Sequence, residues 1–154
     1  MAKNSSKKVD IIGLLSFGMF LLLVGSIFAS TPQLLNKIFD FARDFHLQEV
    51  YPGVKFFAPS STHPVLYNVV FQFCLIFAVL QVFILIARFV MKDSVGRKAE
   101  TFSSIVFWLG AALALNYLVA GTIEWFTFLG WIIVAIGLSI TVRSAMVLVF
   151  RGKG

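Results

Sequence analysis

The chain alternates between long apolar segments and shorter polar stretches. Four segments are apolar over enough residues to form membrane-spanning helices, at 9–30, 65–91, 102–120 and 122–150. About 20 such residues cross the roughly 30 Å hydrocarbon layer of a bilayer. The prolines all lie between the first and second segments, at positions 32, 52, 59 and 64. We therefore expect four spanning helices without proline kinks.

The longest polar stretch, residues 31–64, begins with a pattern typical of an amphipathic helix. Thr31 and Pro32 suit the first positions of a helix, and apolar residues then recur at helical spacing on one face. These apolar residues are Leu34, Leu35, Ile38, Phe41, Ala42 and Phe45. We expect this helix, of about 14 residues, to lie on the membrane surface or on the other helices.

Turn-forming residues predict two connections. Pro52-Gly53 and Pro59-Ser60 indicate turns and a loop after the amphipathic helix, with one short extended piece at 54–57. The third and fourth segments are separated by about one residue, Gly121, which predicts a tight antiparallel pair of helices. Thr122 suits the N-cap of the fourth helix, with Glu124 in its first turn, where a carboxylate favours the helix dipole.

The composition indicates that lipid is the solvent for much of the chain. Of the 154 residues, 59% are hydrophobic and 13% are charged, whereas soluble domains average about 45–50% and about 25%. A soluble domain of this size could not bury that much apolar surface. We predict a single all-α integral membrane domain over residues 1–154, a four-transmembrane-helix bundle with an amphipathic outer helix between the first two spans.

The net charge of +6 does not predict a nucleic acid partner, because the basic residues flank the apolar segments instead of forming one stripe. With a cytoplasmic N-terminus, ten basic residues lie inside, namely Lys3, Lys7, Lys8, Arg88, Lys92, Arg97, Lys98, Arg143, Arg151 and Lys153, and three lie outside, namely Lys37, Arg43 and Lys55. This bias predicts a multi-pass protein of the cell membrane with both termini in the cytoplasm. We expect Arg88 and Arg143 to extend toward the inner headgroups.

Small residues predict where the helices meet. Residues such as glycine and alanine, spaced four or seven apart, let helix backbones approach closely. The first, third and fourth segments carry such residues, namely Gly18, Gly25, Ala29, Gly110, Ala114, Gly130 and Gly137. We expect these three helices to make the tight contacts, with more of the second left to lipid or to a partner.

Polar residues within or beside the spans are the candidate functional positions, because they are costly in lipid. We single out Gln72, Gln81, Asn116 and Glu124. They could form hydrogen bonds between helices, which we favour, or they could line a hydrophilic pathway with Asn116 and Glu124 at its mouth. Gln81 also shares a heptad stripe with Arg88 and with Cys74, the single cysteine.

A second group of polar residues lies in the outer stretch, namely Asp40, Asp44, His46, Glu49 and His63. The spacing matches no metal-binding loop. We interpret Asp40 and Asp44 as part of a solvated helix face, and we expect neither a metal nor a cofactor. A proton or metal site formed by a histidine and a carboxylate is the alternative.

The sequence indicates the architecture of the protein more clearly than its function. No nucleophile, zinc, phosphate-loop or dinucleotide motif occurs in the sequence. We favour a non-catalytic accessory or structural subunit of a larger membrane protein complex, in contact with lipid and with other subunits or with itself as a homo-oligomer. A small oligomeric channel or transporter is the alternative, and a membrane enzyme is the third hypothesis.

Overall fold

The computed structural model describes residues 11–151. The expectations for residues 9 and 10 and for Lys3, Lys7, Lys8 and Lys153 lie outside the described residues. Within these bounds, four helices are long and apolar enough to cross a membrane. They are α1 (Ile11–Ser30), α3 (Pro64–Val90), α4 (Val95–Val119) and α5 (Trp125–Arg151). The predicted mainly helical fold with four long apolar helices is confirmed.

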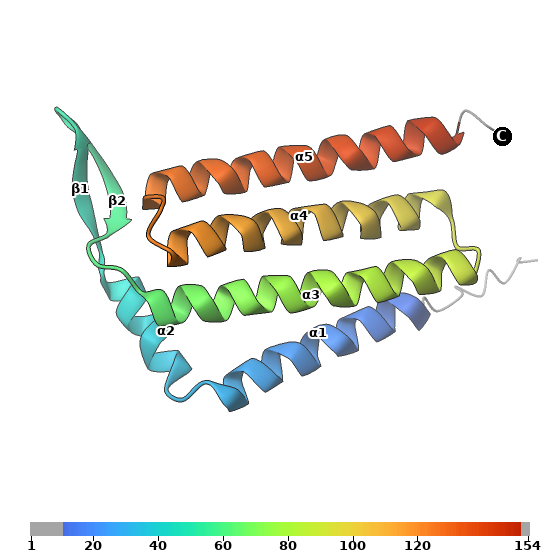
Figure 1. The fold of residues 1–154 in the computed structure, drawn as a ribbon, viewed down its shortest axis with the longest axis horizontal. Coiled ribbons are helices and arrows are strands. Elements are labelled where there is room, and N and C mark those ends of the chain that lie inside the picture. Colours follow the sequence, from blue (N-terminus) through green and yellow to red (C-terminus); the bar gives the residue numbers. More distant parts are fainter. Residues whose placement is uncertain (1–10, 152–154) are drawn as a thin grey trace, which may run out of the picture.

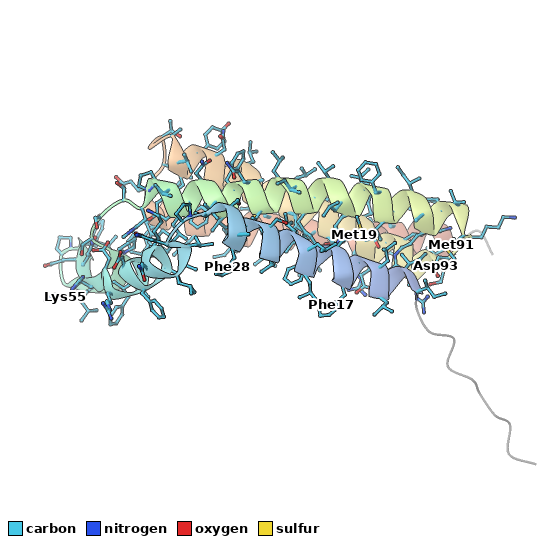
Figure 2. All side chains as sticks on the ribbon, turned by 90° about the horizontal axis from the view of Figure 1, so that it is seen from below. Phe17, Met19, Phe28, Lys55, Met91 and Asp93 are labelled. Atoms are coloured by element: carbon cyan, nitrogen blue, oxygen red, sulfur yellow. The ribbon has the colours of Figure 1, made fainter. Side chains whose placement is uncertain are left out.

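The four long helices lie side by side in the order α1, α3, α4 and α5 (Figure 1). The predicted bundle thus takes the form of an open row, in which the inner helices α3 and α4 have a neighbour on each side and α1 and α5 form the edges. Figure 2 shows Phe17 and Phe28 of α1 pointing away from the other helices, and both side chains are exposed.

The closest contacts surround α4, where small residues do allow close approach. Cys74 of α3 packs with Ala111, Ala112 and Leu115 of α4 in a buried core. On the other side of α4, a Cβ added to Gly110 would lie 2.9 Å from the Cβ of Ala135 on α5. The Ser103 hydroxyl also donates a hydrogen bond of 2.9 Å to the Ser139 carbonyl oxygen of α5. The predicted role of small residues is therefore correct for α4.

The same prediction is wrong for the edge helices. Gly18 and Gly25 of α1, like Gly130 and Gly137 of α5, have open space where a side chain would extend. The second span, α3, is in close contact instead, because its aromatic side chains interlock with those of its neighbours. Phe77 of α3, for example, contacts Trp108 of α4 and Phe20 of α1. Small residues permit close approach, but large aromatic side chains fill a contact equally well.

The stretch between α1 and α3 forms a short helix and a β-hairpin. Helix α2 (Leu34–Arg43) begins two residues later than predicted, because Gln33 adopts a left-handed conformation with φ of 57°. Strands β1 (Phe45–Tyr51) and β2 (Val54–Pro59) then pair antiparallel. The predicted turn at Pro52-Gly53 and the extended piece at 54–57 are confirmed, but the predicted loop is wrong at residues 49–51, which belong to β1. Phe45, expected on the amphipathic helix, also lies in β1. Gly53 turns the chain with φ of 81°, and its N–H donates to a Glu49 carboxylate oxygen at 2.8 Å.

Helices α4 and α5 are joined by a turn that ends α4 instead of beginning α5. Gly121 is left-handed, with φ of 68°. The N–H of Thr122 donates to the Tyr117 carbonyl oxygen and that of Gly121 to the Leu118 carbonyl oxygen, both at 3.1 Å, which is a Schellman motif. The predicted N-cap role of Thr122 is therefore wrong. The residue directly before α5 is Glu124, whose carbonyl oxygen accepts from the Phe128 N–H at 2.9 Å.

The end of the row that carries the hairpin and the α4–α5 turn is called the hairpin end below. The first residues of α1 and the last residues of α5 lie at the other end of the row, called the terminal end, together with the α3–α4 turn (Figure 1). Here Arg88 does not reach outward as predicted. Its side chain is 10% exposed, and its Nη1 atom lies 2.7 Å from an oxygen of Asp93. Arg143 of α5 is exposed.

Asp93 organises the α3–α4 turn at the terminal end. One carboxylate oxygen faces Arg88, and the other accepts from the Ser94 N–H at 2.8 Å and faces Arg97 at 3.3 Å. Desolvation of the carboxyl works in the opposite direction, but the Ser94 N–H and the two guanidinium groups together hold the pKa of Asp93 below its ordinary value. The arginine that the topology rule would place among headgroups is thus part of an internal ion pair.

Candidate functional site

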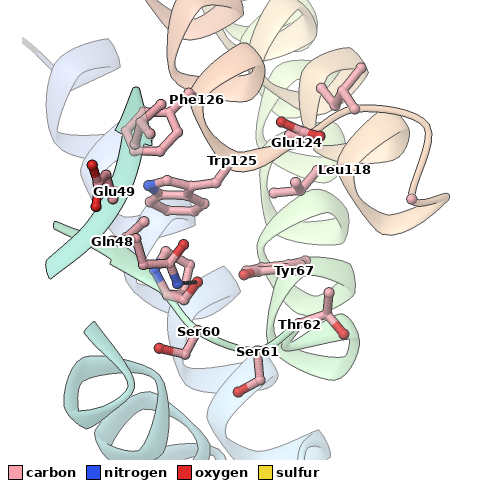
Figure 3. A pocket seen from close by; sticks show the side chains of 15 residues that line it. Gln48, Glu49, Ser60, Ser61, Thr62, Tyr67, Leu118, Glu124, Trp125 and Phe126 are labelled. Carbon is pink, nitrogen blue, oxygen red and sulfur yellow. Dashed lines mark hydrogen bonds between the residues drawn. The ribbon is translucent and has the colours of Figure 1, made fainter. Parts of the chain in front are cut away.

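A cavity of about 610 Å³ lies at the hairpin end, between the hairpin and the α4–α5 turn (Figure 3). Its walls come from four parts of the chain: the hairpin, the segment that leads into α3, the first turns of α3, and the α4–α5 connection. The lining residues are Gln48, Glu49, Val50, Ala58, Pro59, Ser60, Ser61, Thr62, Tyr67, Leu118, Gly121, Ile123, Glu124, Trp125 and Phe126. Cavities of this size are typical of small-molecule sites.

Aromatic side chains hold the α2–hairpin segment against the helices. Trp125, at the start of α5, contacts Phe41 at 5.8 Å and Phe45 at 5.7 Å between ring centroids. Phe56 of β2 meets Phe126 in the same turn of α5 at 6.1 Å. These contacts are edge-to-face, the geometry that ring quadrupoles favour. Because bulky rings separate the hairpin from the helix ends, space remains between them.

Asp44 ties the end of α2 to the segment before α3. One of its carboxylate oxygens accepts three hydrogen bonds, from the Ser61 N–H and the Ser61 hydroxyl at 2.8 Å and from His63 Nε2 at 3.0 Å. The hydrogen bond from His63, followed by those from the Ser61 N–H and hydroxyl, lowers the pKa of Asp44 to about 2. The carboxylate is therefore ionised at neutral pH and fixes the base of the hairpin.

The second histidine lies beside this network but forms a different contact. His46 Nδ1 lies 2.8 Å from the Asp44 carbonyl oxygen and 3.2 Å from the Ser60 hydroxyl. With the proton on Nδ1, the nitrogen donates to the carbonyl, so it cannot also accept the proton of the Ser60 hydroxyl. The Ser61 hydroxyl donates to Asp44 and not to a histidine. Neither serine is therefore arranged as an activated nucleophile.

The structure thus separates the five outer polar residues that the sequence grouped. Asp44, His46 and His63 come together through the network, although the histidines are far apart in sequence. Asp44 is not part of a solvated face as expected, whereas Asp40 is exposed. Over residues 11–151, no three histidine, cysteine, aspartate or glutamate side chains are placed to hold a metal ion. Glu49 belongs to the cavity instead.

The polar residues chosen within the spans do not converge either. Gln72 and Gln81 are nine positions apart on α3, about two and a half turns, so they face opposite sides. Gln81 is buried, at 8% exposed, and Gln72 is exposed. Asn116 is exposed near the hairpin end of α4. The three amides do not form one polar track along the row, and of the four candidates only Glu124 lines the cavity.

Sequence reasoning missed most of the cavity wall. None of Trp125, Gln48 and Ser61 is among the residues singled out from the sequence. Gln48 in fact donates from Nε2 to the Pro59 carbonyl oxygen at 3.0 Å and holds the two strands together. The available signal was the concentration of aromatic residues at 41, 45, 56, 67 and 125–126 around a polar stretch. That pattern does not reveal that the residues meet.

Comparisons with protein-family models, with curated proteins and with solved structures find no match. The functional argument therefore rests on the geometry of this chain.

Proposed function

We propose that the chain is a multi-pass integral membrane protein of the cell membrane, with both termini in the cytoplasm. Four helices long and apolar enough to cross a bilayer support this proposal. The first residues of α1 and the last residues of α5 lie at the terminal end (Figure 1). The same end carries Arg88, Arg97 and Lys98. A concentration of basic residues at one end of a helix row favours the cytoplasmic side.

Within the membrane, the protein acts as a non-catalytic accessory or structural subunit of a larger complex. The observation that carries this proposal is the contrast between inner and edge helices. Only 11% of the apolar stretch of α1 and of α5 is buried, against 28% in α3 and α4. The edge helices also expose glycine-bearing faces, at Gly25 on α1 and at Gly130 and Gly137 on α5. Such faces suit the approach of another helix.

Two exposed amides strengthen the case for a partner. Gln72 and Asn116 are exposed within the long helices, and neither side chain has a hydrogen-bond partner in the described part of the chain. An amide without a partner is costly in hydrocarbon. A neighbouring subunit that offers a donor or an acceptor would remove that cost.

The alternative is a small channel or transporter that works as an oligomer. The opposite orientation of Gln72 and Gln81 argues against a pathway through one copy, so a channel would have to form between copies. The third hypothesis, a membrane enzyme, has the weaker support of the Asp44–His63 pair, in which no serine is arranged as a nucleophile.

A photo-crosslinking residue at position 137, introduced in the native host membrane, tests these proposals. An adduct with one other polypeptide, at a defined mass, supports the subunit. An adduct with a second copy of the chain supports the oligomeric channel. Adducts with lipid alone contradict both. Asn116→Leu should then weaken the association, whereas the matched change Asn36→Leu, on the exposed part of α2, should leave it unchanged.

A further inference from the structure

The charge of the cavity at the hairpin end restricts what could occupy it. Its lining contains two carboxylates, Glu49 and Glu124, and no lysine, arginine or histidine. Lys55 is the strand partner of Glu49, but it does not line the cavity and forms no ion pair with Glu49 within residues 11–151. The Asp44–His63 pair nearby is satisfied internally. The side chains of the cavity therefore present an uncompensated charge of about −2 at neutral pH.

Helix ends do not reverse this charge. The start of α5, at Trp125, contributes roughly half a positive charge, and the end of α4, beside Gly121, contributes roughly half a negative charge. The two contributions oppose each other across the same turn, so the carboxylates determine the sign of the field. An anion bound at the start of α5 would meet Glu124 directly.

Besides the two carboxylates, the wall combines the aromatic residues Tyr67, Trp125 and Phe126 with hydroxyl-bearing, amide and aliphatic residues. Calcium takes six to eight oxygen ligands, whereas within residues 11–151 no three acidic or histidine side chains converge, and one oxygen of Glu49 already accepts the Gly53 N–H at 2.8 Å. Trp125 and Phe126 are half-buried and line the wall. Figure 3 shows Glu49 on the hairpin side of Trp125 and Glu124 on the helix side. Aromatic faces beside carboxylates are a recurring environment for organic ammonium groups.

We propose that this cavity binds an organic cation, an ammonium group carried on an apolar body. Glu124 and Glu49 balance the charge, Trp125 and Phe126 contact the ammonium group and the body, and the oxygen of the Gln48 side chain accepts a hydrogen bond where the ligand offers one. The proposal is independent of the subunit role, because it requires only the residues that line the cavity at the hairpin end. The same chemistry could be that of a lipid headgroup or of a soluble cation.

The full chain in maltoside micelles, titrated calorimetrically with benzyltrimethylammonium, tests the proposal. We expect saturable binding of one equivalent. Glu124→Gln should weaken it about tenfold, because a nearby charge is lost at an exposed position. The matched change Glu100→Gln, at an exposed glutamate on the other end of α4, should have no effect. Trp125→Phe keeps a ring in the aromatic cluster and should weaken binding about threefold.

In the titration, any of three outcomes would overturn the proposal: no saturable binding, equal affinity in the Glu124→Gln and Glu100→Gln variants, or preference for benzylsulfonate or Ca²⁺. Lipid competition then identifies the source of the ligand. Displacement by phosphatidylcholine but not by phosphatidylglycerol supports a headgroup, and displacement by neither supports a soluble cation. Equal displacement by both lipids would contradict a cation site, because phosphatidylglycerol carries no ammonium group.

Discussion

The inner helices α3 and α4 differ from the edge helices α1 and α5 in how they use similar residues. Gly110 of α4 lies against Ala135 with no room for a side chain, while Gly130 of α5 faces open space. Arg88 of α3 is paired with Asp93, while Arg143 of α5 is exposed. A glycine or an arginine in the sequence therefore shows only that a close helix contact or an ion pair can form. The position of its helix in the row decides whether that contact forms in this chain.

This difference also bears on function. The contact between α4 and α5 satisfies polar groups within the chain, as the Ser103–Ser139 hydrogen bond shows. The edge helices expose apolar and small residues along most of their length. If a partner covers the exposed faces of the edge helices, changes on those faces should affect association but not the stability of the isolated chain. Changes at the buried contacts of the inner helices, away from the exposed amides Gln72 and Asn116, should do the reverse. Three pairs of variants test this distinction in the isolated chain.

The largest expected effect concerns the two arginines. Arg88→Ala removes the more buried of the two guanidinium partners of Asp93 in the α3–α4 turn, and breaking a buried ion pair costs about 3 kcal/mol of unfolding free energy. Arg143→Ala should change the stability by less than about 0.5 kcal/mol, as exposed substitutions usually do. Unfolding of the purified chain by titration of a denaturing detergent measures both. Equal stability of the two variants would contradict the internal role of Arg88.

An intermediate effect is expected for the two glycines. In Gly110→Leu the new side chain would meet Ala135 at once, and overpacking of a close contact costs about 1–3 kcal/mol. Gly130→Leu places the same side chain in open space and should leave the stability almost unchanged. The same unfolding assay applies. A larger loss from Gly130→Leu than from Gly110→Leu would reverse the assignment of inner and edge contacts.

The smallest effect concerns the attachment of α1. Phe20 meets Phe73 and Phe77 of α3 at centroid distances of 5.9 Å and 5.6 Å, and aromatic pairs contribute about 0.5–1.5 kcal/mol each beyond burial. Phe20→Ala should loosen α1, seen as a broader distance distribution between spin labels on α1 and α3. Phe17→Ala, at a side chain that is 58% exposed, is the control and should keep the distribution narrow.

The four long helices could be predicted from the sequence because their signal is local. A run of about 20 apolar residues must bond its backbone groups internally in hydrocarbon, and a helix does so within a single segment. The positions of α1, α3 and α5 therefore follow from the apolar residues alone. Helix α4 begins at Val95, well before the apolar segment at 102, because its polar first turns are stabilised by the ion pairs around Asp93.

The tertiary structure alone decided which faces meet and what forms the cavity. Helices that are apolar on all sides carry no periodic stripe, so the sequence of α1 or α5 does not encode a contact face. The Asp44–His63 bond and the wall formed by Glu49, Glu124 and Trp125 join residues that are distant in the chain. The hairpin pairs residues close in sequence, but its position against α5 depends on distant aromatic contacts. Such contacts depend on the geometry of the whole row, because each partner gains its energy only after the others are in place.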